Sequence, residues 1–218
     1  MKREFILTED GSHTIFVPEM GEHFHSVHGA LQESLHIFIN HGYKKVDCNP
    51  ISILEIGFGT GLNAFLTLLE SISVSRGVYY ESWEAFPLTT EESGQLNYPD
   101  LLNTGRNFFD AIHQAEWGKD IDLTSGFTLK KVEADIRTFV SDRFYDLVYF
   151  DAFGPDYQPE LWQTPIFERI AACMKKDSRL VTYSAKGQVR RNLREAGFLI
   201  EKAPGPPGKR EITIAIKS

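Results

Sequence analysis

The feature that most constrains this chain is the stretch Ile51-Ser-Ile-Leu-Glu-Ile-Gly-Phe-Gly-Thr-Gly-Leu-Asn63, in which an apolar run passes into three alternating glycines. The run Ile51–Ile56 predicts a buried parallel strand, and the residues after Gly61 predict a helix. A strand that turns into a helix through glycine brings backbone N–H groups and a helix N-terminus close to a ligand. The alternative is a tight turn that binds nothing. The stretch therefore predicts an α/β chain with a ligand site at this turn.

The residues of this turn distinguish three ligands. A triphosphate loop needs Gly-Lys-Ser/Thr where this chain has Gly61-Leu-Asn. A dinucleotide loop needs glycine at its sixth place, which Leu62 occupies. Alternating glycines behind an acid favour the amino-acid end of S-adenosylmethionine, because its ammonium needs a carboxylate and close backbone approach. The residues predicted to bind it here are Glu55, Gly57, Phe58, Gly59, Thr60, Gly61 and Asn63.

Two further acids follow strand-like runs, in chain order. Glu84 ends the run Val78–Glu84, where Rossmann-like folds hold a ribose diol. Glu81 is the competitor, but period-2 alternation places it within the strand. Asp135 follows the next run and precedes a short helical segment, so it can accept a hydrogen bond from an adenine amino group. We expect Glu84, Ala85, Asp135 and Ile136 to complete the cofactor site.

Length, cysteine content and charge limit the class of protein. The 218 residues suit one large α/β domain, and no apolar run of membrane-spanning or signal-peptide length is seen, so a cytoplasmic protein is expected. The cysteines, Cys48 and Cys173, have no metal or redox spacing.

The charges are unevenly distributed along the chain. Residues 1–150 hold 11 Lys/Arg against 22 Asp/Glu, whereas residues 151–218 hold 12 against 8. A basic C-terminal part permits contact with nucleic acid, although a solvated charged surface is an equal alternative.

The pattern along the chain predicts a Rossmann-like S-adenosylmethionine-dependent methyltransferase fold: a mostly parallel sheet with a closing antiparallel hairpin, helices on both faces and a small N-terminal hairpin extension. We expect one domain, residues 1–218, with an N-terminal hairpin and helix over 1–45 and a core over 46–218. A helical insertion around 87–117 is expected to cap the site. Strands are predicted at 5–8, 14–17, 51–56, 78–84, 127–134, 145–151, 179–184, 198–202 and 211–216, and helices at 28–41, after 61, at 164–175 and at 187–196.

The fourth core strand leads into Asp151-Ala-Phe-Gly-Pro155, which we expect at the ligand-binding edge of the sheet. An amine that attacks a methyl group must present its lone pair in line with the methyl–sulfur bond, so an acceptor has to hold its N–H bonds. An aliphatic amine must also lose a proton before it attacks. Asp151 is the candidate for both tasks, Phe153 for stacking on a base and Pro155 for stiffening the loop. The alternative for Asp151 is an acid that only makes an Asx-type turn.

A histidine cluster, His23-Phe-His-Ser-Val-His28, raises the question of a metal. No fourth ligand stands nearby, and the spacing matches no zinc pattern. We expect no metal, and we expect these histidines to lie at the surface or to contact substrate.

The motifs of this chain together resemble the MnmC-type tRNA methyltransferases. The segments that carry the resemblance are Glu22-His-Phe-His-Ser-Val-His-Gly-Ala-Leu-Gln-Glu33, Leu54–Asn63, Glu84-Ala-Phe-Pro-Leu88, Asp151–Trp162, Val189–Phe198 and Gly208-Lys-Arg-Glu211. Three positions depart from the pattern: Phe24 replaces a tyrosine, Ala152 a glycine and Gln158 an asparagine.

The resemblance implies methylation of 5-aminomethyl(-2-thio)uridine in tRNA, with S-adenosylmethionine as donor. Carried over by position, Asp151 faces the amine. Substrate contacts are expected from His25, Ser26, Glu33, Phe153, Pro155, Lys186, Lys209 and Arg210, the three basic residues contacting tRNA phosphates. Because no oxidase sequence follows Ser218, the aminomethyl precursor is expected from a separate flavin oxidase or another wobble-modification enzyme.

Two other functions stay open. The same fold could carry a transferase acting on a small polyamine-like amine, whose site would need several carboxylates. It could also serve a non-catalytic, cofactor-binding partner of a tRNA-modifying oxidase. A dinucleotide oxidoreductase is disfavoured by Leu62.

Overall fold

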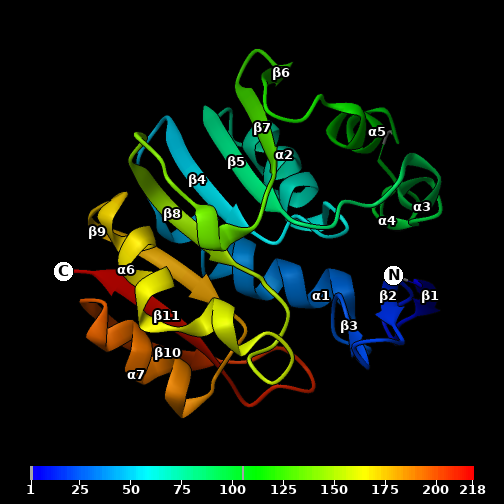
Figure 1. Ribbon diagram of the computed structural model, residues 1–218. Helices are drawn as coiled ribbons and strands as arrows, with labels where there is room; N and C mark the ends of the chain where they lie inside the picture. The colour runs from blue at the N-terminus through cyan, green and yellow to red at the C-terminus, as the bar shows by residue number, and fades with distance from the viewer. Residues whose placement is uncertain (1, 105) are drawn as a thin grey trace.

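An eight-stranded mixed sheet forms the centre of the computed structural model, which describes residues 2–104 and 106–218 (Figure 1). Its strand order is β10-β11-β9-β8-β4-β5-β7-β6, and a separate three-stranded sheet has the order β1-β2-β3. The strands are β1 (Glu4–Leu7), β2 (His13–Val17), β3 (Glu22–His23), β4 (Ile51–Ile56), β5 (Val78–Glu84), β6 (Asp120–Thr124), β7 (Phe127–Glu133), β8 (Tyr145–Phe150), β9 (Met174–Thr182), β10 (Phe198–Pro204) and β11 (Glu211–Lys217).

The central strands β9, β8, β4, β5 and β7 are parallel, and antiparallel pairs close both edges. The predicted closing hairpin is confirmed, since β10 pairs with β11 from Phe198 opposite Lys217 to Pro204 opposite Glu211. The chain leaves β4 toward β5 on one side and later returns to β8 on the other. The carboxyl ends of β4 and β8 therefore meet where the strand order reverses, which is where open α/β sheets bind ligands.

Helices cover both faces of the sheet, as predicted (Figure 1). Neighbouring strand residues pack into different cores: Ile53 faces the cluster that includes Phe65 and Phe38, whereas Leu54 faces the one that includes Phe167 and Leu193. The helical elements are α1 (Ala30–Ser34), η1 (Leu35–Asn40), η2 (Tyr43–Lys45), α2 (Leu62–Ser73), α3 (Thr90–Gly94), α4 (Tyr98–Leu101), α5 (Arg106–Gln114), η3 (Ile136–Thr138), η4 (Pro159–Trp162), α6 (Thr164–Ala172) and α7 (Gly187–Glu195).

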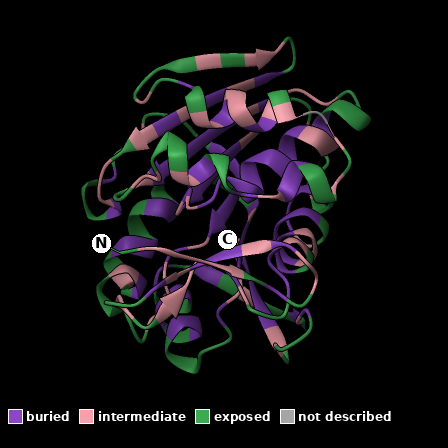
Figure 2. Cartoon of the chain, turned by 90° about the vertical axis from the view of Figure 1, so that its right-hand side faces the viewer, coloured by how far each residue is buried: buried purple, intermediate pink, exposed green. Residues whose placement is uncertain are grey.

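Figure 2 shows buried residues along the inner strands and exposed residues on the outer faces of the helices. The inner strands are runs of mostly apolar residues, which explains why their positions could be predicted from the sequence. Two strands, β3 and β6, were not predicted. β3 has only two residues, and Asp120-Ile-Asp-Leu-Thr124 lies at the sheet edge with no fully buried residue. The helix predicted over 28–41 forms as α1 and continues with π-helical geometry in η1. Among the described residues, no helix has the length and apolar character needed to cross a bilayer.

Candidate functional site

A cavity of about 640 Å³ opens at the carboxyl ends of β4, β5, β7 and β8. This volume is within the range typical of small-molecule sites. The strand ends supply one wall, and residues from the N-terminal extension supply another. The lining residues are Glu22–Val27, Glu33, Ile56–Gly59, Leu62, Asn63, Trp83–Phe86, Ala134–Arg137, Asp151–Phe153, Gln158, Glu160, Leu161, Tyr183 and Lys209.

The glycine turn after β4 forms the floor of this cavity. Gly57, Gly59 and Gly61 have φ values of +91°, +50° and +72°, which other residues rarely adopt. A side chain at Gly57 would place its Cβ 2.5 Å from the carbonyl oxygen of Asp151. Gly61 is the N-cap of α2, so the turn presents backbone and a helix N-terminus to the cavity. This close backbone approach fits the amino-acid end of S-adenosylmethionine.

Glu84, at the end of β5, lies in the cavity wall as expected for a ribose-binding acid. Its Oε2 accepts a hydrogen bond of 3.0 Å from the Gly59 N–H, and its Oε1 accepts one of 2.8 Å from the Phe86 N–H. The carboxylate therefore holds the glycine turn against the segment that follows β5, and both oxygens keep a second lone pair for a ligand.

Asp135, the third acid, also lines the cavity, together with Ile136. Its side chain caps η3 by accepting from the Arg137 N–H at 2.8 Å. The hydrogen bonds from the Arg137 guanidinium lower the pKa of Asp135, so its carboxylate is charged at neutral pH. Arg137 thus competes for the oxygens that adenine would use.

Glu55 lies outside the cavity lining, which corrects the expectation that it faces the cofactor ammonium. It is fully buried within β4, where Oε2 accepts a 2.6 Å hydrogen bond from Ser82 and Oε1 has no hydrogen-bond partner among the described residues. Burial raises the pKa of Glu55 to about 8. Successive strand side chains point to opposite faces of the sheet, and the Glu55 side chain points into the core, away from the cavity. Thr60 and Gly61 also support the turn from outside the lining.

Asp151, the predicted catalytic residue, joins the two halves of the site. It follows β8, and its N–H donates to the Ile56 carbonyl at 2.8 Å. Its Oδ2 accepts a 2.8 Å hydrogen bond from the side-chain amide of Asn63. Burial first, and then the Glu33 carboxylate, raise the pKa of Asp151 to about 7, against the opposing effects of Asn63 and Lys209. A carboxyl that titrates near neutral pH is suited to exchanging a proton with an amine.

The wall opposite the glycine turn holds most of the expected substrate residues. His25, Ser26 and Glu33 come from the N-terminal extension, and Phe153 packs edge-on against Phe24 with ring centroids 5.1 Å apart. His25 is buried, with Nε2 2.8 Å from the Thr60 hydroxyl. Burial lowers the pKa of His25 to about 4, so this imidazole is neutral.

The three basic residues predicted to contact phosphates do not share one surface. Lys209 lines the cavity and its ammonium lies 2.7 Å from Glu33 Oε2, so this residue lies apart from the other two, and its contact with a tRNA phosphate stays a prediction. Lys186 and Arg210 are exposed and outside the lining, and Lys186 pairs with Asp156. Pro155 also lies outside the lining.

The expected insertion contains α3, α4 and α5, but no described residue of 87–117 lines the cavity. The prediction that it caps the site is wrong. Its His113 instead supports the glycine turn from outside, with Nε2 donating to the Thr60 carbonyl at 3.1 Å. The N-terminal extension occupies the place expected for the insertion, and its three clustered histidines have separate partners: Phe16 for His23, Thr60 for His25 and Glu9 for His28.

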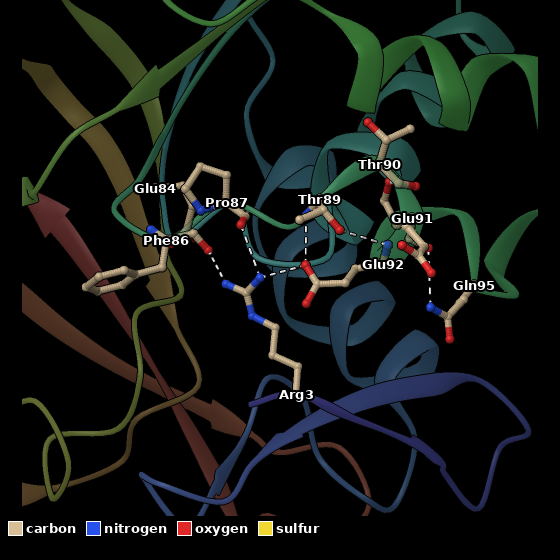
Figure 3. A network of polar contacts seen from close by, with 10 residues as sticks. Arg3, Glu84, Phe86, Pro87, Thr89, Thr90, Glu91, Glu92 and Gln95 are labelled. Carbon is tan, nitrogen blue, oxygen red and sulfur yellow. Dashed lines mark hydrogen bonds and ion pairs between the residues drawn. The ribbon is translucent and has the colours of Figure 1, made fainter. Parts of the chain in front are cut away.

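Arg3 fastens the N-terminal sheet to the cavity wall (Figure 3). Its guanidinium donates to the carbonyl oxygens of Phe86 at 2.5 Å and Pro87 at 3.1 Å, and to Glu92 Oε2 at 2.8 Å. Glu92 also accepts from the Thr89 N–H in the capping box of α3. These contacts join the extension to the segment after Glu84 and so hold it across the site.

Sequence reasoning missed several lining residues. Tyr183 follows the carboxyl end of β9, so the same strand-end rule that identified Asp151 could have identified it. Phe24 faces Gly59, with ring atoms 3.1 Å from where a Cβ would stand, and no local signal predicts that meeting. The other lining residues outside the predicted set are Glu22, His23, Val27, Ile56, Leu62, Trp83, Phe86, Ala134, Arg137, Ala152, Gln158, Glu160 and Leu161.

Comparison with protein families gives one match that covers just over half of the chain. Residues 106–218 match the model described as S-adenosyl-L-methionine-dependent methyltransferase. Curated relatives include the tRNA 5-methylaminomethyl-2-thiouridine biosynthesis bifunctional protein MnmC of Cupriavidus metallidurans, 31% identical over 97% of this chain, and that of Paracidovorax citrulli, 30% identical over 90%. The chain spans about one third of the length of these relatives, 33% in each case.

Solved structures agree with the fold. MnmC2 from Aquifex aeolicus superimposes with a TM-score of 0.79 at 27% identity, covering 98% of this chain and 69% of that one. Spermidine synthase from Thermotoga maritima gives a TM-score of 0.60 at 13% identity, covering 100% and 72%. The second likeness concerns the fold alone.

Proposed function

The chain belongs to the S-adenosyl-L-methionine-dependent methyltransferases, and from that premise we propose that it methylates the 5-aminomethyl nitrogen of wobble (2-thio)uridine in tRNA. The product is 5-methylaminomethyl(-2-thio)uridine. The curated relatives bear a name that refers to this modified nucleoside, and they support the proposal.

The observation that carries the proposal is the place of Asp151. Its backbone adjoins Gly57 of the cofactor-side turn, and its carboxylate belongs to the same cavity as Phe153 and the N-terminal wall. An acceptor at that junction is what N-methylation requires, because it can hold an amine between a base-stacking ring and the donor.

When bound, S-adenosylmethionine supplies an electrophilic methyl group, with nitrogen–carbon bond formation matched by breakage of the sulfur–carbon bond. The residues of the chain prepare the amine. Asp151 accepts a hydrogen bond from the amine and, with a pKa of about 7, can take the proton that an ammonium must lose. Asn63 fixes one oxygen of Asp151, and Phe153 with Phe24 offers an aromatic surface to the base.

For the tRNA, Lys186 at the N-cap of α7 and exposed Arg210 are the proposed phosphate contacts. Such contacts hold RNA without reading its sequence. They lie outside the lining residues, as expected where a base enters the cavity and the backbone stays at the surface.

One observation favours a second candidate, a transferase acting on a small polyamine. Besides Asp151, the cavity is lined by Glu22, Glu33 and Glu160, more carboxylates than the 151–159 loop alone offers. However, Glu33 is already paired with Lys209, which reduces the negative charge available to a multiply charged substrate.

The test uses tRNA from a strain that lacks the methyltransferase and accumulates the aminomethyl nucleoside. The purified chain is incubated with this tRNA and a deuterated methyl donor, and the nucleosides are analysed by mass spectrometry. We expect labelled 5-methylaminomethyl(-2-thio)uridine. Putrescine and spermidine are offered in parallel reactions.

Two controls make the outcome specific. Donor binding is measured by calorimetry on the same preparation, and tRNA without the aminomethyl group is included. Tight donor binding without any labelled nucleoside would refute the tRNA proposal, and labelled polyamine in its place would establish the second candidate.

A further inference from the structure

Two opposite charges meet inside the cavity, on the substrate side. Lys209, from the loop between β10 and β11, places Nζ 2.7 Å from Oε2 of Glu33 on α1. Glu33 is only 4% exposed and the Lys209 side chain is 27% exposed, so the carboxylate is shielded from solvent and the ammonium partly so. Among the described lining residues, the other Lys or Arg is Arg137, which pairs with Asp135 on the cofactor side. Lys209 is therefore the cation of the substrate wall.

The loop that carries Lys209 is fixed in place. Gly208 has a φ of +82°, and a side chain there would collide with the ring of His28. The His36 Nε2 donates to the Pro204 carbonyl at 2.8 Å. The Lys209 ammonium also lies 4.3 Å from the centroid of the Tyr183 ring. These contacts hold the ammonium in place. A charge must be fixed in this way if it is to shift the protonation of a neighbouring group.

This position couples the pair to Asp151. The Tyr183 hydroxyl donates to the Ala152 carbonyl at 2.7 Å, so the ring beneath Lys209 holds the residue that follows Asp151. After burial, the Glu33 charge is the largest cause that raises the pKa of Asp151, and Lys209 acts in the opposite direction. The two members of the ion pair therefore act on Asp151 with opposite signs.

We propose that the Glu33–Lys209 ion pair sets the proton occupancy of the amine site, with the Lys209 charge favouring the neutral, nucleophilic amine and the Glu33 charge favouring the protonated one. This inference rests on the proposed function. An anionic Asp151 alone would stabilise the ammonium form, which cannot attack, whereas a fixed cation disfavours it. In this role Lys209 acts on the amine through its fixed positive charge, and does not contact a tRNA phosphate as the sequence suggested.

The Asp151 carboxyl and the bound amine titrate as one coupled pair, so their last proton leaves at a pKa that belongs to both groups. Burial holds the pKa of Tyr183 well above its ordinary value and lowers that of His25 to about 4, so both stay neutral. The titratable and charged groups around the pair are Glu22, His25, His28, Glu33, Asp151, Asp156, Tyr183 and Lys209.

The test measures single-turnover methyl transfer to aminomethyl-tRNA from about pH 5.5 to 9.5. Lys209→Met should move the acid limb of the profile upward, on the order of one pH unit, because the variant lacks the cation that expels the proton. Glu33→Gln should move it downward, because the variant lacks the anion that retains the proton. The double variant should fall between them, and Lys209→Arg, which keeps the charge, should follow wild type.

A purely structural role would lower rates without moving the profiles in opposite directions. Lys44→Met is the matched control, since Lys44 pairs with Glu70 at 3.1 Å and lies outside the cavity lining. If Glu33→Gln does not fold, the contrast between Lys209→Met and Lys209→Arg decides alone. Superimposed or equally shifted profiles overturn the inference. A wild-type protein that makes no methylated nucleoside at any pH refutes the proposed function instead.

Discussion

The side-chain amide of Asn63 donates a 2.8 Å hydrogen bond to Oδ2 of Asp151, and this contact links the start of α2 to the end of β8. A second bond, from the Asp151 N–H to the Ile56 carbonyl at 2.8 Å, holds the backbone. Within residues 2–104 and 106–218, no protein donor contacts the other oxygen, Oδ1. Asp151 is therefore held by one oxygen and has the other available for a substrate amine.

Asp151→Ala should spare binding of both donor and tRNA yet slow methyl transfer roughly 10²-fold or more, a range common for general acid–base groups. Asp151→Asn separates positioning from proton removal, because the amide carbonyl still accepts a hydrogen bond but cannot carry a proton away. We expect positioning to dominate, so the Asn variant should retain most activity. Single-turnover rates measured across pH check this.

Asp142→Ala, at an exposed position, serves as the control for removal of a carboxylate. If the Asn variant is as slow as the Ala variant, and higher pH partly rescues both, proton removal is the larger contribution. Near-wild-type rates in Asp151→Ala would refute the assignment, and Asp156 would be the next residue to test.

Gly59→Val should weaken donor binding at least tenfold. The φ of +50° at this position costs a β-branched residue about 1–2 kcal/mol, and the new Cβ would stand 3.1 Å from Cδ1 of Phe24, at the cavity floor. Gly94→Val is the control, because a Cβ there meets nothing within 4 Å and φ is not positive. Unchanged donor affinity by calorimetry in the Gly59 variant would mean that the donor binds elsewhere.

Glu84→Ala should cost roughly 1–3 kcal/mol of donor binding, because the ribose hydroxyls lose their acceptors. The same change leaves the Gly59 and Phe86 N–H groups without their acceptor. Glu84→Gln retains one acceptor oxygen, so this variant should lose less donor affinity than Glu84→Ala. Glu91→Ala, exposed on α3, controls for removal of a nearby charge. Equal affinities for wild type and Glu84→Ala would remove this residue from the ribose role.

The elements and strand ends were predictable because they follow local rules. Apolar runs identified the buried strands β4, β5 and β8, alternation identified β7, and the glycines at 57, 59 and 61 form the turn predicted after β4, with positive φ values. Glu84 and Asp151 follow from the rule that ligands bind at the carboxyl ends of parallel strands. Each of these inferences needed only neighbouring residues.

The rest depended on which distant segments meet. Nothing near Lys209 in the sequence indicates that it turns inward to Glu33, a partner 176 positions away. In the same way, whether Glu55 faces the cavity or the core depends on the packing of β4 between β5 and β8. Arg3 holds the N-terminal sheet against the cavity by donating to backbone carbonyl groups. Every residue has such a carbonyl, so the sequence does not indicate which ones Arg3 contacts.

Glu55→Gln should stabilise the protein increasingly as pH rises. The pKa of this carboxyl is about 8 in the folded chain against an ordinary 4.5, so above about pH 4.5 the unfolded chain releases a proton that the folded chain retains. Wild-type stability therefore falls between about pH 4.5 and 8. Each pKa unit corresponds to about 1.4 kcal/mol, so the variant should gain a few kcal/mol at pH 8 and little at pH 5.

Urea unfolding at pH 5 and pH 8 measures this difference in the free energy of unfolding. A glutamine can still accept the hydrogen bond that Ser82 donates to Glu55. Glu168→Gln, at an exposed position of α6, is the control and should show no such trend. A difference between Glu55→Gln and wild type that is the same at both pH values would mean that the buried carboxyl is ionised.

Neutralising Lys186 or Arg210 should weaken tRNA binding and flatten its dependence on salt. Removing one cation that touches a phosphate should reduce the slope of log affinity against log salt by about one, because one condensed counterion fewer is released. Lys176→Ala is the control, since this exposed residue lies at the amino end of β9, opposite the cavity. Lys209→Met should also leave the slope unchanged, because its ammonium is engaged by Glu33 inside the cavity. Filter binding from 50 to 300 mM salt, a range chosen to span about 0.1 M, measures these slopes. A wild-type slope in Lys186→Ala and Arg210→Ala would exclude phosphate contact by these residues. A reduced slope in Lys209→Met would mean that Lys209 contacts the RNA backbone.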